Sequence, residues 1–324
     1  MSAPTVLDIF AARRRIAPYV QPTLLRHSAW LSAAAGRPVH LKLESLNPTN
    51  SFKIRGAFSA LVRVLELHPS STTRPEIVTA SAGNHGRAMA YAAERLGLSV
   101  VIFTPATAPR TKRDAIRRHG ADLRDDAPTY DEAEAMARAR AAGSGGLFIS
   151  PYNHADVIAG AGTIGLEIAE ACPEVGTVFT PLGGGGLGSG VGLALRAAAP
   201  GARLVGVEAA ASTPFTTGLA RGAITAIEPG PTLADGLAGN LEPESITFEL
   251  IQRLIDDVVV VSEDQLRNAL RGMAAEEHLI VEGASAVAIA AVQAHRGEPG
   301  PAVALVTGAN IDVEKLGEVL LAAP

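Results

Sequence analysis

The chain has 324 residues, of which 47% are hydrophobic and 19% are charged, and its formal net charge is −5. The acidic balance provides no basic field for nucleic acid, and no apolar run approaches the length of a membrane span. Cys172 is the only cysteine, which excludes an internal disulfide and a thiolate metal cluster within one chain. We therefore expect a soluble, cytoplasmic protein with no nucleic-acid or membrane partner.

Strand-like and helix-like segments alternate along almost the whole chain. In chain order, strands are predicted at 39–43, 76–80, 99–104, 146–150, 176–181, 203–208, 257–261 and 302–307. Helices are predicted at 85–96, 110–119, 130–142, 163–171, 187–198, 263–278 and 284–295. This alternation predicts an α/β fold in which mostly parallel sheets are flanked by helices on both faces.

The length of the chain favours two lobes, each with its own sheet and core. Proline and serine at 69–75 and glycine at 143–146 indicate where the chain passes from one lobe to the other. We predict a large cofactor-binding domain from residues 1–70 and 150–324, and a small domain from residues 71–149 that binds the substrate carboxylate.

A lysine between two bulky apolar residues is the first chemical signal, in the run Ser51-Phe52-Lys53-Ile54-Arg55-Gly56. It follows a turn that ends the first predicted strand. In an apolar pocket the charged ammonium is disfavoured, so the lysine pKa falls and the free amine becomes a nucleophile toward aldehydes. Such a lysine can hold pyridoxal phosphate (PLP) as a Schiff base. A surface charge is the simpler interpretation of Lys53 alone, and the motifs downstream argue against it.

Four consecutive glycines form the second signal, in Gly183-Gly184-Gly185-Gly186-Leu187 between a predicted strand and a predicted helix. Backbone N–H groups without Cβ atoms can wrap an anion, and the start of a helix adds a favourable dipole. A flexible linker is the alternative, but linkers are rare between a buried strand and an apolar helix. We interpret the run as a phosphate-binding loop.

The same segment also satisfies a dinucleotide-binding pattern through Gly183, Gly185 and Gly188. Glu208 stands about 20 residues further on, where an acid that binds ribose is expected. An NAD-dependent oxidoreductase is therefore a rival hypothesis. It gives no role to Lys53.

Two further strand ends carry polar residues. Ser81-Ala82-Gly83-Asn84-His85-Gly86 joins a strand to a helix, and its hydroxyl, amide and N–H groups can bind a substrate carboxylate. An ordinary helix cap would need only one of these polar residues. Thr307 ends the last predicted strand, from which it can reach a ring nitrogen of a cofactor.

Together these motifs resemble the serine/threonine dehydratase family of PLP enzymes, which has the tryptophan-synthase-β-like fold (PLP fold type II). The match covers nearly the whole chain. It includes Ile158-Ala159-Gly160-Ala161-Gly162-Thr163 and Ala234-Asp235-Gly236, which are similar to further family signatures. Leu237-Ala238-Gly239-Asn240-Leu241-Glu242 resembles the branch that contains hydroxyectoine-utilisation and phenylserine dehydratases.

The resemblance implies a role for each motif. Lys53 would bind PLP covalently and move the proton of the substrate α carbon, while Phe52 would pack on the cofactor ring. Asn84 would bond the ring hydroxyl, and Thr307 would meet the pyridine nitrogen. The phosphate would bind to Gly183, Gly184, Gly185, Gly186 and Leu187. The substrate would contact Ser81, Ala82, Gly83, Asn84, His85 and Tyr152.

Two departures from the family's pattern refine these expectations. Family racemases have a serine, the second acid/base, where this chain has Ala82, so we expect elimination with little racemisation. Members with a divalent metal use a glutamate that matches Glu208 and a second carboxylate where this chain has Pro214, so we expect no metal and a structural role for Glu208.

We predict a PLP-dependent ammonia-lyase that eliminates the β-hydroxyl of an amino acid of the serine/threonine type, giving a 2-oxo acid and ammonia. A hydroxyectoine-derived, phenylserine or hydroxyaspartate substrate is an alternative. The NAD oxidoreductase and a catalytically silent binding protein are alternatives of other classes. The resemblance also implies a homodimer.

Overall fold

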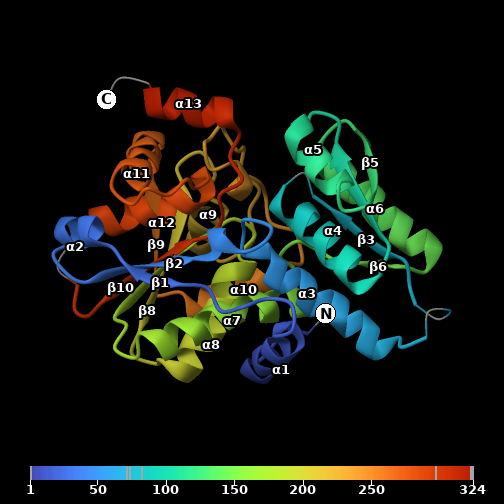
Figure 1. The fold of residues 1–324 in the computed structure, drawn as a ribbon, viewed down its shortest axis with the longest axis horizontal. Coiled ribbons are helices and arrows are strands. Elements are labelled where there is room, and N and C mark those ends of the chain that lie inside the picture. Colours follow the sequence, from blue (N-terminus) through green and yellow to red (C-terminus); the bar gives the residue numbers. More distant parts are fainter. Residues whose placement is uncertain (1, 71, 73, 82, 296–297, 322–324) are drawn as a thin grey trace.

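Two mostly parallel sheets organise the chain in the computed structural model, which describes residues 2–70, 72, 74–81, 83–295 and 298–321. In Figure 1 the helices and strands of the small sheet lie at the right and those of the large sheet at the left. The large sheet has the order β1 (Leu25–His27), β2 (Val39–Leu43), β10 (Ala302–Val306), β7 (Thr177–Pro181), β8 (Arg203–Ala209) and β9 (Asp257–Val261). The small sheet has the order β5 (Asp122–Ala127), β4 (Val100–Pro105), β3 (Ile77–Ala80) and β6 (Leu147–Phe148). Only β1 runs antiparallel to its neighbour within these ladders, which confirms the predicted α/β architecture.

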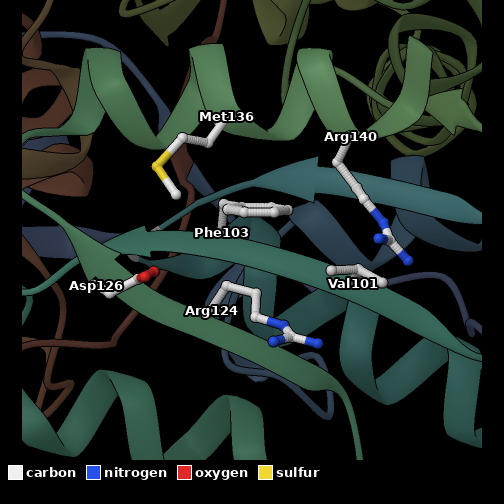
Figure 2. Close-up of a pocket in the computed structure, with 6 residues that line it drawn as sticks. All are labelled: Val101, Phe103, Arg124, Asp126, Met136 and Arg140. Carbon is white, nitrogen blue, oxygen red and sulfur yellow. The ribbon is translucent and has the colours of Figure 1, made fainter. Parts of the chain in front are cut away.

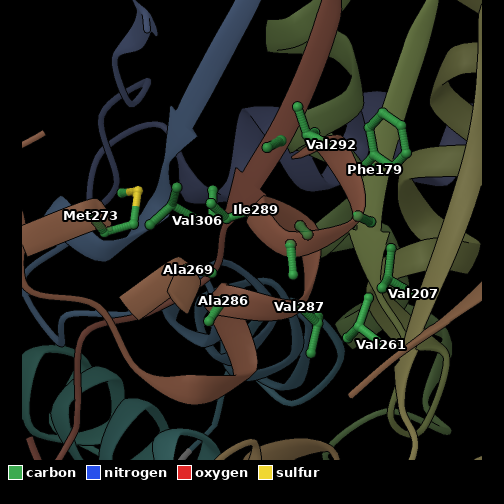
Figure 3. Packing of buried hydrophobic residues seen from close by; sticks show 14 of the residues in the cluster. Phe179, Val207, Val261, Ala269, Met273, Ala286, Val287, Ile289, Val292 and Val306 are labelled. Carbon is green, nitrogen blue, oxygen red and sulfur yellow. The ribbon is translucent and has the colours of Figure 1, made fainter. Parts of the chain in front are cut away.

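Helices cover both faces of the large sheet. On one face lie α2 (Ala29–Ala35), α11 (Glu263–Ala275) and α12 (Gly283–Ala294), and on the other lie α7 (Ala155–Ala171) and α8 (Gly186–Ala198). Successive residues of β10 alternate between these layers, since Ala304 and Val306 pack with α12 while Val303 and Leu305 pack with α7 and α8. Figure 3 shows the first layer, in which Phe179 and Val207 of the strands meet side chains of α12.

The small sheet is also covered on both faces. α4 (Asn84–Leu96) and α3 (Lys53–Leu67) cover one face, and α6 (Tyr130–Ser144) covers the other through Ala133, Ala137 and Ala141. α5 (Arg110–Arg117) flanks α4 and β5. Because α3 also packs on α7, this helix joins the two sheets, and its first residue is Lys53.

α7 begins at Ala155, eight residues before the predicted start at 163. Its glycines were unfavourable for a helix prediction, because glycine costs about 1 kcal/mol in a helix interior. In the structure they allow close packing. A Cβ on Gly160 would lie 2.5 Å from the carbonyl oxygen of Arg55 in α3.

Several other elements were missed by the sequence patterns. They are α1 (Val6–Ile16), β1, α2, α3, β5, α9 (Pro214–Arg221), α10 (Ile246–Leu254) and α13 (Val313–Leu321). The sequence Asp122-Leu123-Arg124-Asp125-Asp126 is too polar to suggest a strand, yet it forms the solvated edge strand β5. The chain leaves the small sheet after Phe148 of β6, so the glycines at 143–146 lie before the last small-sheet strand. The domain boundaries at 70/71 and 149/150 stay predictions. None of the described helices combines the length and the apolar character needed to cross a bilayer.

Candidate active site

Lys53 is the first residue of α3, the helix that joins the two sheets. Its Nζ donates to the carbonyl oxygen of Pro151 at 2.8 Å and lies 5.1 Å from the centroid of the Phe52 ring. Burial lowers the pKa of Lys53 to about 8, although the charge of Glu282 opposes that shift. The neutral amine is therefore well populated near pH 8, as a nucleophilic lysine requires.

A buried ionic cluster fixes the first turn of α3. Arg55 lies two residues after the lysine and is 1% exposed. Its guanidinium donates to Glu44 at 2.8 Å and 2.9 Å and to Glu167 at 2.6 Å and 2.9 Å. Lys42 also pairs with Glu167. Charges this deep must be paired to be tolerated, so the cluster constrains the position from which Lys53 projects.

The end of β10 lies beside the same lysine. The backbone N–H of Phe52 donates to the Thr307 carbonyl oxygen at 2.9 Å, and Ser51 forms an antiparallel bridge with Gly308. The Thr307 hydroxyl is buried, 3.1 Å from the Ser285 hydroxyl. Thr307 is thus a neutral hydrogen-bonding group held close to Lys53, and Ser285 is a neighbour that the sequence patterns did not single out.

The glycine loop joins β7 to α8 as predicted, with Gly186 as the first residue of the helix. Gly185 has a positive φ of 80°, which favours glycine. Added Cβ atoms would meet aromatic rings, because they would lie 2.2 Å from Tyr152 Cγ at Gly184 and 2.5 Å from Phe215 Cζ at Gly185. The loop 183–187, which we call the glycine cradle, therefore has no room for side chains at Gly184 and Gly185. Backbone N–H groups at the start of a helix are suited to a phosphate.

Asn84 forms hydrogen bonds with two residues in loops of the large sheet, Glu282 and Asn310. Its Nδ2 donates to both carboxylate oxygens of Glu282 at 2.8 Å and 3.0 Å, and its Oδ1 accepts from Asn310 Nδ2 at 2.6 Å. Burial raises the pKa of Glu282 to about 7. The sequence analysis missed this glutamate. The available signal was an acid at the start of an apolar helix, in Val281-Glu282-Gly283-Ala284.

A prediction follows for the pH dependence of stability. Since the folded-state pKa of Glu282 is raised to about 7 from 4.5, its protonation stabilises the fold fully below pH 4.5. That stabilisation is lost as the pH rises through 7, by on the order of 3 kcal/mol. Glu282→Gln stays neutral, so its free energy of unfolding should fall less than the parent's between pH 5 and pH 7.5. Urea unfolding of both cofactor-free proteins measures this difference, and equal pH slopes would contradict it.

Two buried histidines lie near the lysine. The Thr79 hydroxyl donates to the Ile149 carbonyl oxygen at 2.7 Å, so it accepts the proton that His85 carries on Nε2, at 3.1 Å. Burial, with a smaller effect from Lys53, lowers the pKa of His85 well below its ordinary value, and burial lowers that of His154 to about 4. Both rings are therefore neutral at pH 7. Their Nδ1 atoms and Ser51 Oγ are buried without a partner in the described part of the chain.

The loop predicted to bind a carboxylate runs from the end of β3 into α4. Ser81 is buried, and its hydroxyl accepts from the Gly83 N–H at 3.2 Å. Asn84 and His85 begin α4, which places the start of that helix at the site. Ala82 lies outside the described residues. The predicted carboxylate loop therefore lies on the small-sheet side of Lys53.

Glu208 stabilises a helix in the structure. Its carboxylate accepts from the backbone N–H groups of Phe215 at 2.7 Å and Thr216 at 2.9 Å, in the first turn of α9. Pro214 is the first residue of that helix. Among the described residues, no group of three or more His, Cys, Asp or Glu side chains could hold a metal ion. A ribose-binding role for Glu208 would require it to give up these helix contacts.

A separate hollow lies on the small sheet, between α6 and strands β4 and β5 (Figure 2). It has a volume of about 230 Å³, and Met136 and Arg140 of α6 point into it. Its two arginines are already paired, Arg140 with Glu76 and Arg124 with Asp122. None of the predicted site residues lines it, so we assign it no part in the chemistry.

The residues that surround Lys53 fit PLP. The amine is buried and partly neutral, the glycine cradle suits a phosphate, and Thr307 and Asn84 offer neutral hydrogen-bonding groups. Ser51, His85 and His154 each have a buried polar atom without a partner among the described residues, and such atoms can hydrogen-bond a polar ligand. These roles remain assignments by position.

Comparison with known proteins identifies the family. Residues 16–308 match the family described as pyridoxal-phosphate dependent enzyme. The L-threonine ammonia-lyase of Thermotoga maritima is 37% identical over 98% of this chain and 78% of its own length. The processed form of threonine deaminase isoform 2 from Solanum lycopersicum superposes with a TM-score of 0.89 at 33% identity, over 98% of this chain and 92% of the other. Maize serine racemase superposes with a TM-score of 0.91 at 29% identity, over 98% and 97%. The NAD oxidoreductase hypothesis is wrong, and the chain belongs to the family of pyridoxal-phosphate dependent enzymes.

Proposed function

We propose that the chain is a PLP-dependent ammonia-lyase that converts a β-hydroxy amino acid of the serine/threonine type into a 2-oxo acid and ammonia. The observation that carries this proposal is the arrangement around Lys53, where a lysine of lowered pKa lies near a glycine cradle, a neutral hydroxyl and the loop that we predict to bind a carboxylate. Relatives named threonine ammonia-lyase and threonine dehydratase support the same reaction.

The chain's own residues have four tasks in this reaction. Bound PLP supplies an electron sink for negative charge at the substrate α carbon. Lys53 accepts the α proton, and its depressed pKa suits a base that works near neutral pH. The loop from Ser81 to His85 holds the substrate carboxylate. The glycine cradle anchors the phosphate, and the neutral Thr307 hydroxyl does not promote protonation of a ring nitrogen as a carboxylate would. The hydroxyl then leaves the β carbon, and the α proton taken up by Lys53 balances it, so that one water molecule is released. The enamine product hydrolyses to the oxo acid and ammonia.

The test is a substrate panel with purified, PLP-loaded protein. It contains L-threonine, L-serine, phenylserine and 3-hydroxyaspartate, with 2-oxo acid and ammonia measured separately. We expect equal amounts of the two products from at least one L-hydroxy amino acid. A loaded protein that releases neither product from any of the four would overturn the proposal. Turnover of phenylserine or hydroxyaspartate in preference to threonine would support the alternative substrates.

Racemisation is expected to be minor. It needs a proton donor on the face of the carbanion opposite Lys53, and Ala82 has no ionisable group where family racemases have serine. In deuterated water an L-hydroxy amino acid should therefore give oxo acid with very little D-isomer. Ala82→Ser should raise the D-isomer yield, as measured by chiral chromatography. D-isomer from the parent at a rate similar to oxo acid would show a second acid.

We also propose that the protein works as a homodimer in the cytoplasm, on the basis of the family resemblance. Light scattering on the purified protein tests the first point. We expect twice the chain mass of 33.3 kDa, and a monomer at micromolar concentration would contradict it.

A further inference from the structure

One stripe of α6 faces the active site. Tyr130, Glu134 and Arg138 are spaced by four residues, which places them on the same side of the helix. Tyr130 contacts the carbonyl oxygen of Ala80 at 3.5 Å, at the base of the carboxylate loop. Arg138 reaches Glu242, which belongs to a loop on the large-sheet side, at 2.7 Å.

Glu242 is the centre of a hydrogen-bond network. Its Oε1 accepts from the Ser150 hydroxyl at 2.6 Å, and its Oε2 accepts from Asn153 Nδ2 at 2.7 Å. Its backbone N–H donates to the Tyr152 hydroxyl at 2.8 Å. Together with Arg138, four partners hold a glutamate whose side chain is 12% exposed.

Three of those partners belong to the segment 150–153, which carries two parts of the site. The carbonyl oxygen of Pro151 accepts the hydrogen bond from Lys53 Nζ. The ring of Tyr152 forms the wall against Gly184, and its carbonyl oxygen lies 2.9 Å from where a Cβ of Gly186 would be. A shift of this segment would therefore move the amine's acceptor and the wall of the phosphate cradle together.

We infer that Glu242 is a positioning residue for the elimination, which fixes the segment 150–153 against Lys53 and the glycine loop, and that Arg138 extends this control to α6. The inference rests on the proposed function. Its structural half, the positioning of the segment, can be measured without turnover.

The ion pair between Arg138 and Glu242 is expected to contribute little to stability, which favours a positioning role over a structural one. The Arg138 side chain is 45% exposed, so its ion pair with Glu242 is expected to contribute under about 1 kcal/mol. Arg138 also pairs with Glu134 within α6 and lies 4.2 Å from the Phe148 ring centroid. Removing it should leave the helix folded while the contact across the site is lost.

The experiment compares Glu242→Gln and Arg138→Met with Arg140→Met as the matched control. Arg140 is on the same helix, is 54% exposed and pairs with Glu76 away from the site. In the PLP-loaded enzymes we expect Glu242→Gln to lower kcat by about 10- to 100-fold with KM within about threefold, because small misplacements of reacting groups are costly. Arg138→Met should lower kcat less, and Arg140→Met should match the parent.

Two further measurements separate positioning from general damage. Hydrogen exchange of the cofactor-free proteins should be faster in peptides that contain residues 150–153 for both test variants, and unchanged for Arg140→Met. PLP titration should show weaker binding to Glu242→Gln. The inference would be overturned if Glu242→Gln had the same hydrogen exchange, PLP affinity and kcat as the parent. Faster hydrogen exchange over the whole chain would also overturn it.

Other variants and controls keep the inference testable. If Glu242→Gln fails to fold, Arg138→Met removes one contact of Glu242 without changing a residue of the segment 150–153, and it should give the same local exchange pattern to a smaller extent. A parent that releases no oxo acid would refute the proposed reaction, while the exchange and binding measurements would still decide whether Glu242 positions the segment.

Discussion

Lys53→Ala is expected to lower the rate of oxo-acid formation at least about 1000-fold, because the variant lacks both the nucleophile for PLP and the base for the α proton. PLP bound to a lysine absorbs visible light, and borohydride bleaches that band. The band should be absent from the variant. Stability should be retained, since burial already disfavours the charged amine and lowers the pKa of Lys53 to about 8. Product assays, absorption spectra and urea unfolding measure the three effects.

Lys42→Met is the matched control, because Lys42 is a buried lysine in the ionic cluster behind α3 and not at the site. Its removal leaves Glu167 with Arg55 as its remaining cationic partner and should cost about 3 kcal/mol of stability, while covalent attachment of PLP persists. A Lys53→Ala protein that still forms the borohydride-fixed adduct would show that another amine holds the cofactor.

Gly185→Ala is expected to weaken PLP binding at least about tenfold and to lower the free energy of unfolding by about 2–5 kcal/mol. The positive φ of Gly185 costs an L-residue about 1–2 kcal/mol, and the added Cβ would lie 2.5 Å from Phe215 Cζ, which adds an overpacking penalty of about 1–3 kcal/mol. The ring must shift or the loop must move, and either change distorts the phosphate cradle. Urea unfolding and PLP titration of the cofactor-free protein measure the two effects.

Gly36→Ala supplies the control for this substitution. Gly36 ends α2 with a φ of 71°, and no atom lies within 4 Å of where its Cβ would be. It should lose only the backbone part, about 1–2 kcal/mol, with PLP affinity unchanged. If Gly185→Ala binds PLP as tightly as Gly36→Ala does, the glycine loop is not the phosphate site.

The parts of the site that could be predicted from the sequence are those that lie at strand ends. Lys53, the glycine loop and Thr307 each follow a strand or strand-like run, and the carboxyl ends of parallel strands meet at one edge of a sheet. The polar or glycine-rich composition of such short runs is unusual enough to detect. The same local patterns predicted most strands to within one or two residues.

The residues that the sequence did not reveal depend on contacts between distant segments. Glu282 reaches Asn84 across 198 positions, and Glu242 reaches Ser150 across 92. Each is a single acid in an ordinary stretch, and nothing local distinguishes it from a solvated side chain. β5 was missed for a related reason, since its polar residues are favourable only at the edge of a finished sheet.

Where α7 passes α3, the side chain at Gly160 is one hydrogen atom, and the Arg55 carbonyl oxygen occupies the room that a methyl group would need. Every single-nucleotide missense change there adds at least that methyl. In a saturation library selected for growth on the enzyme's product, Gly160 should therefore be as depleted of variants as Lys53, although it meets no reacting atom. Surface positions such as Arg140 should accept many residues. An intolerant position in such a library marks steric exclusion as readily as it marks chemistry.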